Sequence, residues 1–143
     1  MTELEEKNKA LIRQWHEEID KGKLDNFWEM FHPDFLWYDP SNSPNPLSKE
    51  ETCEFLAKAI KAFTRMTHKI EEIIAVNDKV IVRTVNCVTH AGEFQGIPVE
   101  GKEVEFSGIN IFRIKEGKIV EAREEADKLS WFQQLGLVIK PND

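Results

Sequence analysis

One predicted β-hairpin constrains the fold of this chain more than any other stretch. Apolar and polar residues alternate over most of residues 104–114, which predicts a half-buried strand. Glu116-Gly117 follows, and the glycine supplies the positive φ that a two-residue hairpin turn needs. A second strand is predicted over residues 118–126, and a short helix over residues 129–135. Two long antiparallel strands that lead into a helix indicate a sheet that forms one wall of a pocket.

The other elements are predicted from capping signals and apolar periodicity. Thr2 with Glu5, and Ser48 with Glu51, form capping boxes that indicate the start of two helices. The predicted helices cover residues 2–21, 24–31 and 48–63, and the predicted strands cover residues 34–38, 68–76 and 79–90. Helices followed by a run of antiparallel strands favour an α+β fold. Without a repeat or a linker-like stretch, residues 1–143 are expected to form a single domain.

Charge and cysteine content exclude several classes of protein. The 19 basic and 26 acidic residues give a net charge of −7, which disfavours nucleic acid and anionic membranes as partners. No apolar run approaches the roughly 20 residues of a membrane-spanning helix. Cys53 and Cys87 lie in predicted elements with no signal peptide before them, so we expect reduced thiols in a cytoplasmic protein.

The sequence carries no pattern of a metal or cofactor site. The histidines are far apart in the sequence, and no predicted helix or strand carries two of them as possible metal ligands. They are His16, His32, His68 and His90. A phosphate-binding loop is excluded because Gly92 and Gly96 are not followed by Lys-Ser/Thr and a helix. There is no G-x-S-x-G motif. These observations predict no metal and no cofactor, and they leave acid–base chemistry.

Residues 89–98 carry the segment that is most similar to a known family. They read Thr-His-x-Gly-x-Phe-x-Gly-Ile-Pro, which resembles a segment of the SnoaL-like polyketide cyclases, also called ester cyclases. Further matches follow in the same order at residues 108–113, 117–121, Asp127 and residues 134–136. The resemblance covers nearly the whole chain. It implies the nuclear transport factor 2-like fold, which is a cone-shaped, curved antiparallel sheet wrapped around the N-terminal helices, with a short C-terminal helix. It also implies a homodimer formed through the sheet.

Asp127 is the first catalytic candidate. The resemblance gives this aspartate the role of general acid/base in an apolar cavity, where partial removal from water would raise the pKa of a carboxyl group. The residues themselves offer a second interpretation, because Asp127 precedes a predicted helix and is a good N-cap. The two roles are compatible.

Arg123 is the main departure from the family, whose members often carry tryptophan at this position. Alternation divides the strand into a charged row and an opposite row: Glu121, Arg123, Glu125 and Asp127 against Val120, Ala122, Glu124 and Ala126. If Arg123 points inward, it pairs with a carboxylate or binds an anionic substrate group. If it points outward, it belongs to a solvated charged face.

The remaining candidates supply polar and aromatic groups. His90 is a second catalytic candidate, since imidazole titrates near neutrality, although a lone histidine is often structural. Tyr38 could donate its hydroxyl group to an enolate oxygen, or lie at a sheet edge in water. Asn110 alternates with apolar residues and is expected to orient Asp127 across the hairpin. Aromatic residues that could line the pocket, or simply form core, are Trp28, Trp37 and Phe112.

The leading hypothesis is a cofactor-independent enzyme that acts on a small, mostly apolar carbonyl compound. Asp127 would act as the acid/base, His90, Tyr38 and Asn110 would orient or polarise the substrate, and Arg123 would adjust the charge of the pocket. The reaction would be aldol-type cyclisation, isomerisation or dehydration. The alternative is a non-catalytic small-molecule binding or dimerisation domain of the same fold.

Overall fold

The computed structural model describes residues 1–40, 45–93, 101–138 and 140–142. Its elements in chain order are α1 (Glu3–Lys21), the 3-10 turn η1 (Phe27–Met30), β1 (Phe31–Tyr38), β2 (Leu47–Ser48), α2 (Lys49–Ala62), β3 (Phe63–Val76), β4 (Lys79–His90), β5 (Glu103–Lys115), β6 (Lys118–Ala126) and α3 (Lys128–Gln134). Residues 94–98 of the family-like segment lie outside the described residues.

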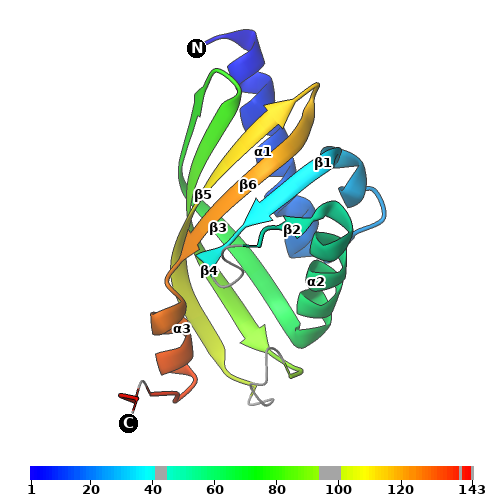
Figure 1. The fold of residues 1–143 in the computed structure, drawn as a ribbon. Helices are drawn as coiled ribbons and strands as arrows, with labels where there is room; N and C mark the ends of the chain where they lie inside the picture. The colour runs from blue at the N-terminus through cyan, green and yellow to red at the C-terminus, as the bar shows by residue number, and fades with distance from the viewer. Residues whose placement is uncertain (41–44, 94–100, 139, 143) are drawn as a thin grey trace.

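The strands form one curved, six-stranded sheet in the order β2-β1-β6-β5-β4-β3 (Figure 1). Strands β3 to β6 pair antiparallel with their neighbours, and β1 joins the sheet by parallel pairing with β6. The predicted hairpin turn at Glu116-Gly117 is present, since both residues have positive φ, and Asn77 has positive φ in the turn between β3 and β4. This sheet confirms the predicted α+β fold with a short C-terminal helix.

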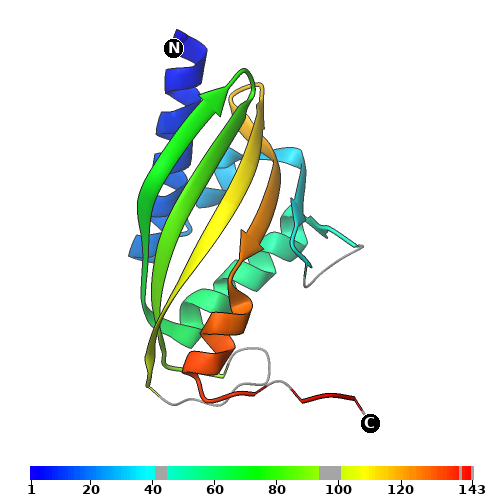
Figure 2. The same cartoon turned by 90° about the vertical axis from the view of Figure 1, so that its left-hand side faces the viewer.

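The inner face of the sheet carries the core, and α1 and α2 lie along it (Figures 1 and 2). Strand β4 alternates between exposed and buried side chains along most of its length, as a strand with one covered face should. Ile12 and Trp15 of α1 belong to the same buried cluster as Val80 and Phe112. A long helix thus closes one side of the concave sheet, while no helix among the described residues covers the outer face.

Local signals set the helix ends. Thr2 and Glu5 form the predicted capping box of α1, and Gly22 ends this helix in the left-handed conformation with φ 67°. Ser48 caps α2 in the same way, with Glu51 as its partner. Neither these helices nor any other helix among the described residues is long and apolar enough to cross a membrane.

Several elements differ from the predicted boundaries, and the short strand β2 was not predicted. Strand β1, predicted over residues 34–38, already begins at Phe31. The helix predicted over residues 24–31 is reduced to η1, because Phe31 already begins β1 and packs on Phe27 with ring centroids 5.2 Å apart. The strand predicted from residue 68 begins at Phe63, directly after α2, where it pairs with His90. Cys53 and Cys87 are free thiols, and both are partly exposed rather than mostly buried.

Candidate active site

A chamber of about 120 Å³ lies between the inner face of the sheet and the helices. Its walls are largely aromatic, and its polar residues come from several elements: Trp15, Trp37, Phe55, Phe106 and Trp131 with His16, Asp39, His68, Asn86, Asn110, Glu124 and Lys128. Such a mixture of apolar walls with a few converging polar groups is typical of small-molecule sites.

Glu124 is the most perturbed carboxyl group of the chamber. It is half-buried on β6, directly across from Asn110 on β5. The pKa of Glu124 is raised to about 7, first because burial disfavours the charged form and second because the Asp39 carboxylate lies nearby. The charges of Lys128 and His68 oppose this shift. A carboxyl group with such a pKa can both accept and donate a proton near neutral pH.

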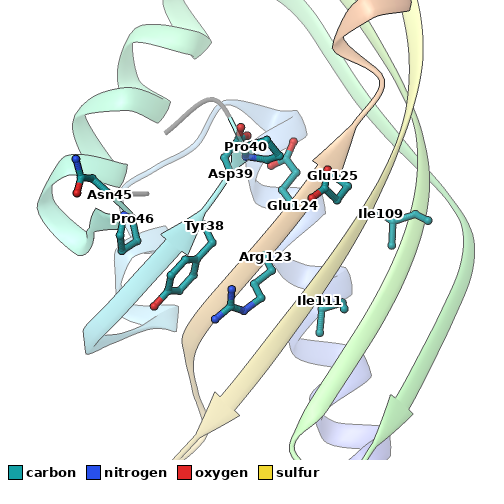
Figure 3. Close-up of a pocket in the computed structure, with 10 residues that line it drawn as sticks. All are labelled: Tyr38, Asp39, Pro40, Asn45, Pro46, Ile109, Ile111, Arg123, Glu124 and Glu125. Atoms are coloured by element: carbon teal, nitrogen blue, oxygen red, sulfur yellow. The ribbon is translucent and has the colours of Figure 1, made fainter. Parts of the chain in front are cut away.

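Glu124 and Asp39 also line a second pocket, which opens on the outer face of the sheet. This outer cleft has a volume of about 640 Å³ and includes Tyr38, Ile109 and Arg123 (Figure 3). The Asp39 carboxylate forms an ion pair with Lys128 Nζ at 2.8 Å, and little of the Asp39 side chain is exposed. The boundary between the chamber and the outer cleft is therefore formed by Glu124 and the Asp39–Lys128 ion pair.

A histidine–carboxylate pair lies on the α1 side of the chamber. His68 Nδ1 is 2.5 Å from Asp20 Oδ1, and the backbone N–H of His68 donates to Asp20 Oδ2 at 2.8 Å. These two contacts fix the ring orientation. Because an Nδ1–H that donates to Asp20 leaves Nε2 unprotonated in the neutral ring, Nε2 of His68 can accept a proton.

His16 lies beside His68, with ring centroids 5.3 Å apart. Burial, followed by the charge of His68, lowers the pKa of His16 to about 4, so its ring is neutral at physiological pH. Nδ1 of His16 donates to the Ile12 carbonyl oxygen at 2.9 Å. His16 thus presents a hydrogen-bond acceptor to the chamber, because Nε2 carries the remaining lone pair.

The structure places Asp127 at the N-cap of α3, where its side chain is exposed and Oδ1 accepts from the Ser130 backbone N–H at 3.0 Å. The residue is outside the lining of the chamber. The predicted capping role is thereby observed, and proton transfer by Asp127 remains a prediction.

His90, the second catalytic candidate, is 1% exposed and serves a packing role at the end of β4. Its Nε2 accepts from the Trp131 indole N–H at 3.0 Å, and its ring meets Phe63 edge-on. His90 is not among the residues that line the chamber, whereas Trp131 is. The histidine therefore positions an aromatic wall.

Arg123 and Tyr38 point away from the chamber into the outer cleft (Figure 3). The Arg123 guanidinium lies over the Tyr38 ring at 3.9 Å from its centroid, and Nε donates to Glu121 Oε1 at 2.9 Å. Of the interpretations open for Arg123, the structure favours the outward one, in which it belongs to a charged outer face.

The remaining predicted binding residues divide into two groups. Trp37 and Asn110 line the chamber. Phe112 is 1% exposed in the core below it, and Trp28 packs on Phe27 and Phe31 at the periphery of that core. Phe112 and Trp28 support the fold and do not line the chamber.

Sequence reasoning missed Glu124 and the Asp20–His68 pair as site residues. The signal for Glu124 was present, since it is the only acid in the row formed with Val120, Ala122 and Ala126. Asp20 and His68 are 48 positions apart, and no periodicity connects them. His16 and His68 are also far apart in the sequence, and the packing of α1 on β3 brings them into contact.

Comparison with known proteins identifies the family. Residues 9–135 match the model of the SnoaL-like polyketide cyclases. Aklanonic acid methyl ester cyclase DnrD from Streptomyces peucetius is 28% identical in an alignment of 131 positions that covers 88% of each chain. Among solved structures, IdmH from Streptomyces antibioticus has a TM-score of 0.79 at 26% identity, covering 91% of this chain and 99% of its own. AclR from Streptomyces galilaeus has a TM-score of 0.85 at 24% identity, covering 94% and 99%. The chain belongs to the SnoaL-like polyketide cyclase family.

Proposed function

We propose that this protein catalyses proton transfer at a carbon next to a carbonyl group, without a cofactor, in a small and mostly apolar molecule. Aldol-type ring closure is the leading reaction, as the name of the relative DnrD suggests. The observation that carries this proposal is Glu124, whose pKa is raised to about 7 in an apolar chamber. We assign to Glu124 the acid/base role that the family resemblance gave to Asp127.

In the proposed reaction, the Glu124 carboxylate removes a proton from the carbon α to a carbonyl group. The electrons of the broken C–H bond form the enolate, and its oxygen accepts a hydrogen bond from the side-chain amide of Asn110, the cross-strand neighbour of Glu124. The enolate carbon then attacks a second carbonyl carbon of the same molecule. The new alkoxide takes the proton back from Glu124, so the enzyme is regenerated and no electrons leave the substrate.

The Asp20–His68 pair would supply a second proton carrier. The short contact between His68 Nδ1 and Asp20 holds the ring in one orientation, and both His68 and Glu124 line the chamber. A base that accepts a proton while an acid donates one allows isomerisation or dehydration of the same enolate, by reprotonation at another carbon or by loss of a β-hydroxyl group as water.

The test is enzyme-dependent hydrogen exchange at the α-carbon. We expect the wild-type protein to accelerate deuterium incorporation from D₂O into β-keto esters, followed by NMR, with saturation at high substrate concentration. Exchange requires removal of the α-proton and return of a deuteron to the same carbon, but no attack on a second carbonyl group, so it detects activity even in a substrate that cannot close a ring. Saturable binding without accelerated exchange or turnover for any carbonyl compound would instead favour a non-catalytic binding domain.

We further propose that the outer face of the sheet mediates a homodimer. A continuous cross-strand row supports this: Ile74 pairs with Ile81, Ile81 with Ile111, Ile111 with Arg123, and Arg123 with Tyr38. The three isoleucines are each more than a third exposed. Apolar side chains that form a contiguous patch usually mark an interaction surface.

Sedimentation velocity tests this assembly. We expect a dimer for the wild-type chain and a monomer for Ile111→Glu, because the substitution places a charge in the centre of the row without disturbing the core. The matched control is Lys115→Glu, at the exposed end of the same strand, which should leave the dimer intact. A monomeric wild-type protein at micromolar concentration would contradict the proposal.

A further inference from the structure

A histidine and an asparagine on neighbouring strands of the chamber wall frame a place for a water molecule. His68 on β3 pairs directly with Asn86 on β4, and both side chains line the chamber. Directly opposed residues of an antiparallel pair have Cβ atoms about 4.5–5.5 Å apart, so one water can bridge the two side chains. Asn86 Oδ1 is buried and has no hydrogen-bond partner among the described residues. Because native proteins satisfy most such groups, a water in this place is the expected partner.

His68 also lines a second space, which lies between α1 and β3. This polar pocket has a volume of about 260 Å³ and is lined by Arg13, His16, Glu17, Asp20, His68 and Ile70. His16 and His68 line both spaces, so their two rings form the wall between the chamber and the polar pocket. Water can therefore reach His68 from the polar side while an apolar ligand occupies the chamber.

Asp20 prepares His68 to act as a base. The Asp20 carboxylate accepts from Nδ1 and from the backbone N–H of His68, which fixes the orientation of the ring and its tautomer. The free lone pair of the neutral ring is then on Nε2. A water that donates one hydrogen to His68 Nε2 and the other to Asn86 Oδ1 keeps its oxygen lone pairs for a reaction. This is the arrangement of a nucleophilic water and its general base.

Two hydrogen-bond donors border the same chamber. The indole N–H groups of Trp15 on α1 and Trp37 on β1 are buried and have no acceptor among the described residues. A buried indole N–H usually finds an acceptor, as that of Trp131 does in His90. Unpaired donors in an apolar chamber are suited to stabilise the negative oxygen of a tetrahedral intermediate.

The lining of the chamber also indicates which nucleophile and which substrates the site accepts. Among the described residues that line it there is no serine, threonine or cysteine, and Lys128 is held in its ion pair with Asp39. Water is therefore the available nucleophile. The carboxyl groups of Asp39 and Glu124 disfavour an anionic ligand. The volume of about 120 Å³ is below the roughly 300–1,000 Å³ of drug-sized sites, which restricts the substrate to one ring or a short chain.

We propose that the chamber also hydrolyses small, uncharged carboxylic esters, with His68 as the general base and a water held between His68 and Asn86 as the nucleophile. The water oxygen bonds to the acyl carbon, one water proton passes to His68 Nε2, and the carbonyl π electrons form the oxyanion, which accepts from Trp15 and Trp37. The carbonyl group then re-forms as the bond to the alkoxy group breaks, and the leaving alkoxide takes the proton from His68. The products are an alcohol and a carboxylic acid. This activity goes beyond the proposed function, because it forms no enolate.

Hydrolysis of methyl butyrate, followed by the ¹H NMR signal of the released methanol, tests the proposal. We expect the wild-type protein to accelerate this reaction with saturation, and without an initial burst of methanol because no acyl-enzyme forms. His68→Gln should lower kcat by about 10²–10⁴-fold, since it removes the general base. The matched control is His32→Gln, which makes the same change at a histidine outside the lining of the chamber and should leave kcat unchanged.

Asp20 and Asn86 are positioning residues, because they act through His68 and through the water. Asp20→Asn, which frees the His68 tautomer, and Asn86→Ala, which removes the second acceptor of the water, should each lower kcat and leave KM near the wild-type value. Added imidazole should restore hydrolysis in His68→Gly, where it can occupy the space of the missing ring, and should not restore it in Asp20→Asn. A purely structural role of His68 would give no rescue by imidazole.

The charge of the substrate and the indole groups give independent checks. Monomethyl succinate carries a carboxylate where methyl butyrate has a methyl group, so repulsion by the acidic groups of the chamber should lower kcat/KM at least about tenfold. Trp37→Phe should lower kcat for methyl butyrate by about 10²-fold, as the loss of one oxyanion donor does. Trp28→Phe, outside the lining of the chamber, should leave kcat unchanged.

Two results would overturn the proposal: no acceleration of methyl butyrate hydrolysis by the wild-type protein, or a wild-type rate in His68→Gln. If His68→Gln does not fold, a wild-type kcat in Asp20→Asn contradicts the proposal equally. The result is independent of the α-hydrogen exchange proposed above. Hydrolysis without exchange would support this inference alone, and exchange without hydrolysis would support the proposed function alone.

Discussion

Replacement of Glu124 by glutamine is expected to lower kcat for α-hydrogen exchange by about 10²–10⁴-fold, which is the usual contribution of a positioned acid/base group. Glutamine has nearly the same volume and keeps one hydrogen-bond acceptor, but it cannot carry the proton. Substrate affinity should therefore change little. Steady-state exchange rates at several substrate concentrations separate the two parameters.

Two matched variants show whether the effect belongs to Glu124. Glu125→Gln makes the same change at the next residue, whose exposed side chain lines the outer cleft, and it should leave kcat within about twofold of wild type. Asp127→Asn keeps a good N-cap and should likewise retain activity, because Asp127 lies outside the chamber lining. If Asp127→Asn abolishes exchange and Glu124→Gln does not, the family-derived assignment to Asp127 is correct.

The family resemblance directed attention to Asp127 because it compares positions along the chain. Physical alternation directs attention to Glu124, which shares a row with Val120, Ala122 and Ala126. A single carboxyl group among apolar residues on one face of a strand has two explanations. Either the residues have been assigned to the wrong faces, or the carboxyl group has a function. The sequence did not predict the register of the hairpin, which pairs Asn110 with Glu124, and Glu124 lines the chamber.

The hairpins and helix ends were predictable because their causes are local. Glu116-Gly117 needs only its own backbone to form a turn, and the capping boxes at Thr2 and Ser48 act over three residues. The Asp20–His68 contact has no local cause. The contact forms because α1 packs across β3. The packing of the core as a whole determines where α1 lies.

The second large effect concerns stability, and it should appear as a difference between variants in the pH dependence of unfolding. The pKa of Glu124 is raised from 4.5 to about 7 in the folded chain, so the folded state binds more protons than the unfolded state between these pH values. The unfolding free energy contributed by Glu124 therefore falls as pH rises through this window. Relative to wild type, Glu124→Gln should gain about 3 kcal/mol of stability between pH 4.5 and pH 7.

His16 should give the mirror image. Its pKa is lowered from 6.5 to about 4, so the unfolded state binds the extra proton and stability falls as pH decreases from 6.5 to 4. Relative to wild type, His16→Gln should gain about 3 kcal/mol over that fall in pH, on top of any constant change in packing. In the wild-type chain the two contributions have opposite slopes and largely cancel between pH 4.5 and 6.5.

Urea unfolding at a series of pH values measures both differences, and contributions shared with wild type cancel in each comparison. Glu125→Gln serves as the control and should show no trend of this size. A flat difference for Glu124→Gln would mean that Glu124 ionises as it does in water, so the chamber would not suppress its charge. The acid/base proposal would then lose its physical basis, because a fully solvated glutamate at neutral pH is too weak a base to remove a proton from carbon efficiently.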